Sequence, residues 1–272
     1  MSSQRGFTLV ELVMVIVLLG IVATISVQFV ALSTQGAIDV GDRQQRALQG
    51  VVVSEQITRQ LREAHPLSIR VRADSNQQCI EWIPILAATS YDSLPFSAAA
   101  NEGIITPLST DVTAQIKSSP SSFRLAVYGY SATNFFDTSV DPAPISPPIS
   151  DIQDNGAVAN GKVILQGNHR FQSQSPTKRL YVIREPVSIC QDDNRLYRFE
   201  GYGLRASQPS YGDLNGLGAG IIAANLKPDS FRVKFIPASL RRSAIVNFAF
   251  VLTSPSGEET RLSQEVQIRN VP

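Results

Sequence analysis

The stretch GFTLVELVMVIVLLGIVATISVQFVAL, residues 6–32, decides how this chain is organised. Residues 12–23 contain only Leu, Val, Met, Ile, Gly and Ala, and the apolar character continues to Leu32. About 20 such residues in a helix span the roughly 30 Å hydrocarbon layer of a bilayer. We therefore expect a membrane-spanning helix, in which the acid Glu11 is the exception that needs a physical reason.

A polar leader, MSSQRG, precedes the apolar run and carries one positive charge at Arg5. An ordinary secretory signal has an apolar centre of about 7 to 15 residues and a small-residue cleavage site after it. This run is longer, and no A-x-A site follows it between Ser26 and Ser33. Because positive charge is favoured on the cytoplasmic side, Arg5 slightly favours a cytoplasmic N-terminus and an exported remainder.

Glu11 has two local explanations and one that requires a partner. Thr8 and Glu11 fit the capping-box pattern S/T-x-x-E, and the helix dipole favours an acid in the first turn. Glu11 is also placed to lie at the level of the lipid headgroups. However, a charge within a membrane segment costs about 2.5 to 3.5 kcal/mol on insertion scales and usually has a partner.

The order of Gly6, Phe7, Glu11 and an apolar helix resembles the N-terminus of type IV prepilins and of the related type II secretion pseudopilins. The resemblance covers about the first 30 residues. It implies that a membrane peptidase cuts after Gly6 and methylates the new N-terminal Phe7, so that Glu11 becomes the fifth mature residue. The new amine would then lie near Glu11, above all between neighbouring subunits, where a low dielectric strengthens their attraction.

The resemblance also implies an α+β, type IV pilin-like fold, in which a long N-terminal helix packs on a mostly antiparallel β-sheet head. The expected parts are a leader (1–6), a membrane and assembly half of the helix (7–32), an amphipathic half (33–65) and a β-rich head (66–272). The implied location is the inner membrane of a Gram-negative bacterium, in a single pass with the N-terminus cytoplasmic and the head periplasmic, and then the extracellular pilus.

The implied partners are the prepilin peptidase, other minor and major pilins, the inner-membrane assembly platform, and membrane lipid before assembly. Within the family, the anchor and the following helix are most similar to minor pilins of the mannose-sensitive haemagglutinin (MSHA) pilus. The chain is long for a major subunit, so we expect a minor pilin of the initiating or tip complex that supports pilus assembly and surface attachment. Two alternatives stay open: a J-like minor pseudopilin of type II secretion, and a tip module that binds glycans or DNA.

The helix can continue from about Thr8 to Ala64, because no proline precedes Pro66. Its second half is amphipathic, with apolar residues near helical spacing among charged ones. These apolar residues are Leu48, Val51, Val52, Ile57, Leu61 and Ala64. Gly36, Gly41 and Gly50 mark either a bend or ordinary close-packing positions.

From Leu67 onward, short runs with period two and β-branched or aromatic residues predict strands. They lie at 68–72, 79–83, 123–128, 162–165, 180–183, 195–199, 231–235, 244–252 and 262–268. The sequence Pro255-Ser256-Gly257 predicts a turn between the last two. Segments 90–120, 134–160 and 206–219 are rich in Ser, Pro, Gly, Asp and Asn, which predicts long loops.

The chain has two cysteines, Cys79 and Cys190, which are too few for a four-thiolate zinc site and are not a CxxC pair. We expect them to form one disulfide between two strands after export to an oxidising compartment. The alternative is two buried free thiols. A bridge that closes a loop of about 110 residues is worth up to about 4.7 kcal/mol in the chain-entropy model.

Composition gives little support for other function classes. The 24 Lys plus Arg residues balance 23 Asp plus Glu without a dense basic cluster, so no nucleic-acid partner is evident. The two histidines, His65 and His169, lie outside any recognisable catalytic pattern. The glycines at 216–220 lack a P-loop lysine, and the acidic turns at 192–194 and 213–216 lack the spacing of a calcium loop. We expect no enzyme activity, no cofactor and no resident metal.

Replacing Gly6 with a bulky residue is expected to leave the six-residue leader uncut, because the peptidase of the resembled family cleaves after a glycine. N-terminal sequencing of the purified chain measures the outcome. Normal Phe7 ends in the variant would refute the assigned cleavage site.

Overall fold

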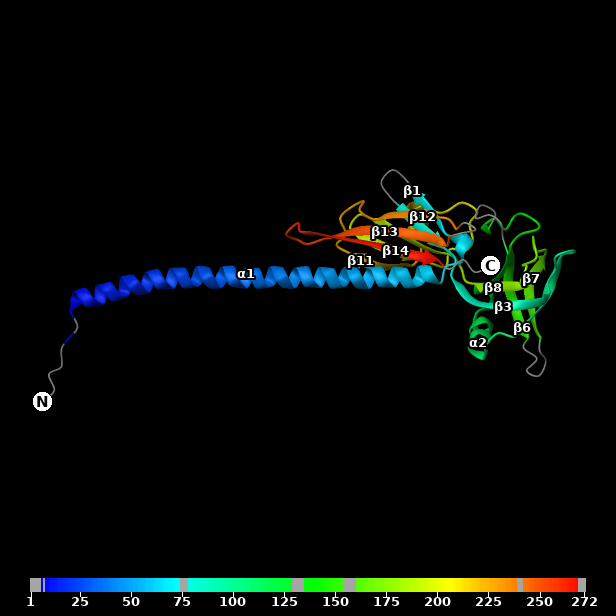
Figure 1. The fold of residues 1–272 in the computed structure, drawn as a ribbon, viewed down its shortest axis with the longest axis horizontal. Helices are drawn as coiled ribbons and strands as arrows, with labels where there is room; N and C mark the ends of the chain where they lie inside the picture. The colour runs from blue at the N-terminus through cyan, green and yellow to red at the C-terminus, as the bar shows by residue number, and fades with distance from the viewer. Residues whose placement is uncertain are drawn as a thin grey trace. The chain divides into compact units, whose positions relative to one another are not determined.

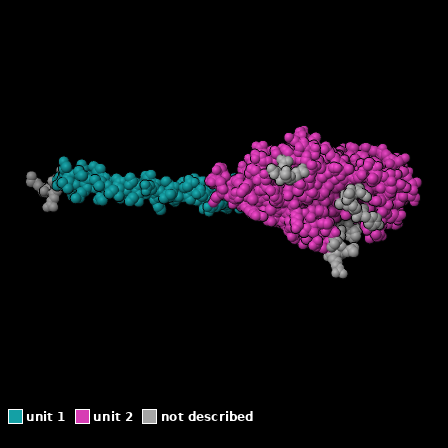
Figure 2. All heavy atoms as spheres, turned by 90° about the horizontal axis from the view of Figure 1, so that it is seen from above, with its two compact units in different colours: residues 1–49 teal, residues 50–272 magenta. Residues whose placement is uncertain are grey.

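The computed structural model describes residues 6, 8–73, 78–128, 135–153, 160–238 and 242–268. The chain divides into two compact units, Met1–Gln49 and Gly50–Pro272, which Figure 2 colours separately. The predicted fold class is confirmed: a long N-terminal helix is followed by an α+β head whose strand pairs are antiparallel.

The first unit consists mainly of the helix α1, which runs from Leu9 to Arg62 and continues into the second unit. Every side chain from Leu9 to Gln45 is exposed, although most of those up to Leu32 are apolar. A helix that is apolar on all sides belongs in lipid or in an assembly. Among the described residues, α1 is the one helix long and apolar enough to cross a membrane.

In the second unit, the last turns of α1 form part of a hydrophobic core. Val53, Ile57 and Leu61 recur every four residues and are almost fully buried. A Cβ at Gly50 would lie 2.4 Å from a methyl group of Leu262. Close packing is therefore the role of Gly50, whereas Gly36 and Gly41 have no neighbouring atom within 4 Å of such a Cβ.

Two antiparallel sheets supply most of the rest of this core (Figure 1). The first has the order β1-β2-β9-β10-β11, and the second has the order β12-β13-β14. Their bounds are β1 Arg70–Ala73, β2 Gln78–Trp82, β9 Val187–Asp192, β10 Arg195–Phe199, β11 Ala219–Ala224, β12 Arg232–Ile236, β13 Ala244–Thr253 and β14 Glu259–Ile268. Along β13 the buried residues alternate, as period-two patterning predicts. Gly257 lies in the β13–β14 turn with φ +85°.

A closed six-stranded barrel is inserted between β2 and β9. Its order is β3-β4-β7-β6-β5-β8, and the pairing of β3 with β8 closes it. The strands are β3 Ile85–Ser93, β4 Ala100–Ile105, β5 Arg124–Val127, β6 Ile145–Gln153, β7 Gly161–His169 and β8 Arg179–Ile183. The short helices are η1 Pro66–Ser68, α2 Thr110–Ser118, η2 Pro120–Ser122 and α4 Tyr211–Leu214.

The prediction of long loops at 90–120 and 134–160 was wrong for much of their length. The first contains β4 and α2, and the second contains β6. Gly103 in β4 and Pro147–Pro148 in β6 weaken the local strand signal. These segments are strands because barrel closure pairs them and buries residues such as Ile105 and Ile149.

The neighbouring residues Val52 and Val53 provide a matched test of the α1 packing. Val53 is 3% exposed and Val52 is 65% exposed. Val53→Ala is expected to lower the free energy of unfolding by about 2 kcal/mol, because it removes buried methyl groups from the core. Val52→Ala is expected to change it by less than about 0.5 kcal/mol.

Chemical denaturation of the full chain in detergent, followed by fluorescence of the single tryptophan Trp82, measures both values. Equal losses in the two variants would contradict the assignment of the buried face of α1.

Candidate functional site

The segment around Glu11 lies at the start of α1. Gly6 is exposed, and Phe7 lies outside the described residues. The Glu11 backbone N–H donates to Thr8 Oγ1 at 3.4 Å, and the Thr8 N–H and hydroxyl both donate to Glu11 Oε2 at 3.3 Å. This is the reciprocal geometry of a capping box, with long bonds.

Capping occupies only one oxygen of the Glu11 carboxylate. In the described part of the chain, Oε2 makes both side-chain contacts and Oε1 makes none. Glu11 is exposed and follows directly on the apolar residues Leu9 and Val10. One carboxylate can therefore cap its own helix through Oε2 and accept an external amine at Oε1.

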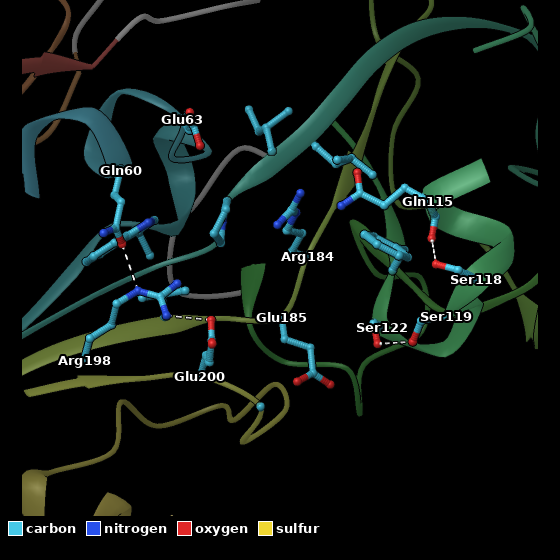
Figure 3. Close-up of a pocket in the computed structure, with 17 residues that line it drawn as sticks. Gln60, Glu63, Gln115, Ser118, Ser119, Ser122, Arg184, Glu185, Arg198 and Glu200 are labelled. Atoms are coloured by element: carbon cyan, nitrogen blue, oxygen red, sulfur yellow. Dashed lines mark hydrogen bonds and ion pairs between the residues drawn. The ribbon is translucent and has the colours of Figure 1, made fainter. Parts of the chain in front are cut away.

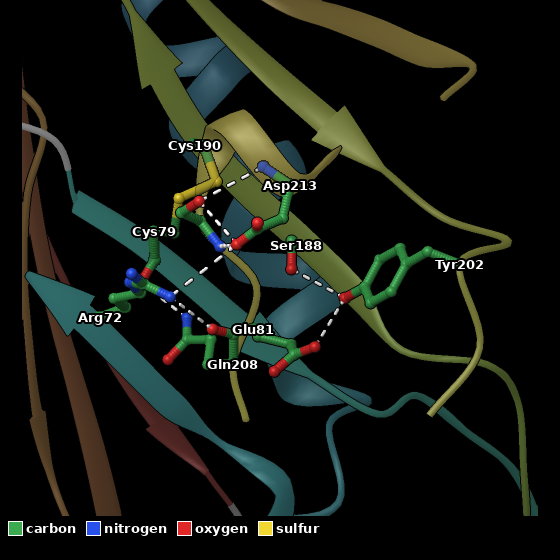
Figure 4. Close-up of a disulfide and its surroundings, with 9 residues drawn as sticks. Arg72, Cys79, Glu81, Ser188, Cys190, Tyr202, Gln208 and Asp213 are labelled. Atoms are coloured by element: carbon green, nitrogen blue, oxygen red, sulfur yellow. Dashed lines mark hydrogen bonds and ion pairs between the residues drawn. A yellow bond between two sulfur atoms is a disulfide. The ribbon is translucent and has the colours of Figure 1, made fainter. Parts of the chain in front are cut away.

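The disulfide joins the two strands that flank the barrel insertion. Cys79 of β2 and Cys190 of β9 are direct cross-strand partners and are bonded to each other (Figure 4). Both are buried and pack with Phe199 and Leu214. The bridge spans 111 residues of sequence, so it removes much conformational freedom from the unfolded chain.

A buried ion pair lies next to the disulfide and was not predicted from the sequence. The side chain of Glu81 is fully buried and accepts a hydrogen bond from Arg70 Nε. The Tyr202 hydroxyl donates to Glu81 Oε1 at 2.8 Å and lies 2.7 Å from Ser188 Oγ. Figure 4 shows Tyr202 reaching Ser188 and Glu81 from the opposite side to Cys79.

Each of the three guanidinium nitrogens of Arg70 donates a hydrogen bond. Its two Nη atoms donate to the carbonyl oxygens of Ala206 and Arg205, each at 2.7 Å, and its guanidinium lies 3.6 Å from the centre of the Phe136 ring. Burial raises the pKa of Glu81, whereas the hydrogen bond and charge of Arg70 act to lower it. Burial, together with the nearby charge of Glu81, raises the pKa of Tyr202. These bonds hold the 202–206 segment on the sheet.

His65 is a structural residue in the connection between α1 and η1, where it caps η1. Its ring stacks on Phe135 with centroids 4.4 Å apart, contacts Tyr181 edge-on, and accepts the Leu67 N–H at Nδ1. Burial lowers the pKa of His65 to about 3. His169 is also buried, and burial lowers its pKa. Within the described ranges, no group of three His, Cys, Asp or Glu side chains is placed to hold a metal ion.

Comparison with known families adds a finding for the N-terminus. Residues 1–27 match the family described as the prokaryotic N-terminal methylation motif. Neither the comparison with curated proteins nor that with solved structures gave a match. The motif, followed by an exposed apolar helix and an antiparallel β head, supports a membrane-anchored type IV pilin or pseudopilin, processed by a prepilin peptidase and assembled with other pilins.

The site residues predicted from sequence lie in two separate places. Gly6 and Glu11 belong to the first unit, and Cys79 and Cys190 belong to the second. The sequence did not predict the roles of Glu81, Arg70 and Tyr202. One signal was present: Glu81 lies between two apolar residues of a predicted strand, and a buried acid in such a position needs a polar partner.

The low pKa of His65 predicts acid sensitivity. The unfolded chain binds a proton at His65 near pH 6.5, whereas the folded chain does so only near pH 3. The free energy of unfolding therefore decreases as the pH falls from 6.5 to 3, because protonation favours the unfolded chain. Relative to His65→Asn, which cannot titrate, the parent is expected to lose about 3 kcal/mol between pH 6.5 and 4. Denaturant unfolding of both chains across this range measures the difference. Parallel pH profiles would contradict a neutral, buried His65.

Proposed function

We propose that this chain is a minor type IV pilin of the MSHA type, of the kind called MshO. A prepilin peptidase cleaves it after Gly6 and methylates Phe7, and the subunit then joins the initiation or tip complex of the pilus. The match of residues 1–27 to the methylation motif is the observation that supports a processed prepilin, and the narrower assignment rests on the likeness of the anchor and the following helix to MSHA minor pilins. Its helix anchors it in the inner membrane with the N-terminus cytoplasmic, and the head is exported.

One feature of the head supports the minor role, and another supports its export. It carries a complete barrel inserted into the sheet, a bulky addition that would have to be repeated at every position of a major-subunit fibre. Its disulfide fits an oxidising compartment such as the periplasm. In the proposed arrangement, the apolar surface of α1 lies in lipid before assembly and against other pilins afterwards.

Glu11 is proposed to attract the N-terminal amine of a neighbouring subunit. Oε1 has no hydrogen bond with any residue that the structure describes, which leaves room for that pairing without loss of the cap. A new subunit would then enter the assembly at the one axial register in which the carboxylate and the amine meet, since a displaced register leaves both charges unpaired in an apolar setting.

Substitutions at Glu11 and Thr8 separate pairing from capping. Glu11→Gln keeps an oxygen for the capping box but removes the charge, so it is expected to be cleaved normally and to reach the pilus fraction at least tenfold less than the parent. Thr8→Ala weakens the cap and keeps the charge, so its incorporation is expected to stay within about twofold. Glu55→Ala, which removes an exposed acid farther along the same helix, is the control.

Immunoblotting of sheared pili, normalised to cleaved protein in the membrane, measures incorporation. Normal incorporation of Glu11→Gln would contradict the proposed pairing role of Glu11.

Mass spectrometry of the mature N-terminus tests cleavage and methylation directly. A pull-down distinguishes the systems, since recovery of secretion components in place of pilus components would favour the minor pseudopilin of type II secretion.

A further inference from the structure

A cavity of about 360 Å³ lies on the barrel, beside β6 and the end of β7. Volumes of about 300 to 1,000 Å³ are usual for small-molecule sites. Part of its lining is apolar and includes the two prolines of β6, Pro147 and Pro148. Its charged lining comes from Arg124 of β5 and from Arg170 and Asp141. The cavity therefore combines an apolar surface with a small set of charges.

Arg124 is a half-buried cation in this lining. Its Nη1 donates to the Ser146 carbonyl oxygen at 3.0 Å, whereas its Nε and Nη2 have no hydrogen bond with any residue that the structure describes. These two nitrogens keep some surface in contact with solvent, so a ligand can reach them. Burial lowers the pKa of Arg124, because removal from water disfavours the charged guanidinium.

Glu185 does not neutralise Arg124 by direct contact. Its charge opposes the effect of burial on the pKa of Arg124, but the two side chains form no ion pair within the described ranges. Figure 3 shows Glu185 at a different cavity, between the barrel and the five-stranded sheet, which arginines and glutamates line together. Because buried charges are normally paired, Arg124 favours a negatively charged ligand.

Arg170 brings a second cation to the same cavity. In the barrel β6 lies between β5, which carries Arg124, and β7, which Arg170 directly follows. Arg170 Nε lies 3.4 Å from Asp141 Oδ1, and its two Nη atoms have no partner in the described part of the chain. His169 also lines the cavity and is neutral at pH 7, because burial lowers its pKa. Two arginines and one aspartate then leave a net positive charge, which attracts an anion.

We propose that this cavity binds a small organic oxyanion, whose carboxylate or phosphate group lies between Arg124 and Arg170 and whose apolar part packs on Pro147 and Pro148. The guanidinium group presents several N–H donors in a plane, which fits the oxygens of a carboxylate or a phosphate. The proposal goes beyond the pilin role and does not depend on it. Its failure would leave the predictions for cleavage and incorporation unchanged.

Calorimetry of the full chain, purified in dodecyl maltoside at low ionic strength, tests the proposal. The probes are benzoate, phenyl phosphate, inorganic phosphate and benzamide, and each titration into detergent alone is subtracted. Benzoate or phenyl phosphate is expected to bind saturably and at least about tenfold more tightly than benzamide, which has the ring of benzoate without its charge. Phenyl phosphate is expected to bind more tightly than inorganic phosphate, which has no ring to cover the prolines.

Substitutions locate that binding. Arg124→Gln and Arg170→Gln are each expected to weaken it at least about tenfold, because each removes a cation. Arg124→Gln should keep the parental denaturant midpoint without ligand, since the lost charge has no ion-pair partner among the described residues. Asp141→Asn should tighten binding about threefold, because it removes a carboxylate that repels an anion. Arg195→Gln, which changes an exposed arginine of β10 outside the cavity, is the matched control and should bind like the parent.

The absence of saturable binding by both benzoate and phenyl phosphate would overturn the proposal, and so would equal binding of benzamide. Parental affinity in both Arg124→Gln and Arg170→Gln would place the binding elsewhere on the chain and would also reject it. Binding of inorganic phosphate as tightly as phenyl phosphate would contradict the role of the prolines. Weaker binding by Asp141→Asn would contradict the electrostatic basis of the site.

Discussion

The pairing of β2 with β9, in which Cys79 lies opposite Cys190, connects the barrel, the five-stranded sheet and the end of α1. On one side of this pair the chain continues into the barrel and returns from it, between Trp82 and Val187, which are themselves register partners. Residues of the same strands, Ile80 and Ile189, pack in the core with the end of α1. The backbone at the end of α1 also bonds to the connection into the barrel: the His65 N–H donates to the Ile83 carbonyl, and the Ile85 N–H donates to the Glu63 carbonyl, each at 2.8 Å.

This arrangement explains why polar groups are buried so close to the disulfide. Both faces of β2 are covered, so Glu81 has no route to water and is satisfied by Arg70 and Tyr202. Removing one partner from such a group leaves an unpaired buried charge, which costs more than the pair contributes. The group therefore enforces one position of the 202–206 segment on the sheet.

The features that the sequence predicts best are those with a local cause. The apolar run and the capping pattern define the start of α1. Strands such as β13 are recognisable because buried and partly exposed residues alternate along them. The barrel could not be predicted from the sequence. The glycine in β4 and the prolines in β6 disfavour strands locally, and pairing with strands distant in the sequence outweighs that local preference.

The same limit applies to the candidate sites. Gly6, Phe7 and Glu11 are recognisable because their spacing along the chain is itself the signal. The role of Glu81 depends on Tyr202, which lies 121 residues later, and no periodicity links the two.

The position of the disulfide has a mechanical consequence. If a pulling force reached the barrel from a bound surface, both chain segments that connect it to the sheet would carry the load, and β2 and β9 could not separate beyond the bridge. The two segments meet at the bridge, so the load would pass on through Cys79 toward α1, and the chain after Cys190, which forms β10 to β14, would lie outside the covalent load path.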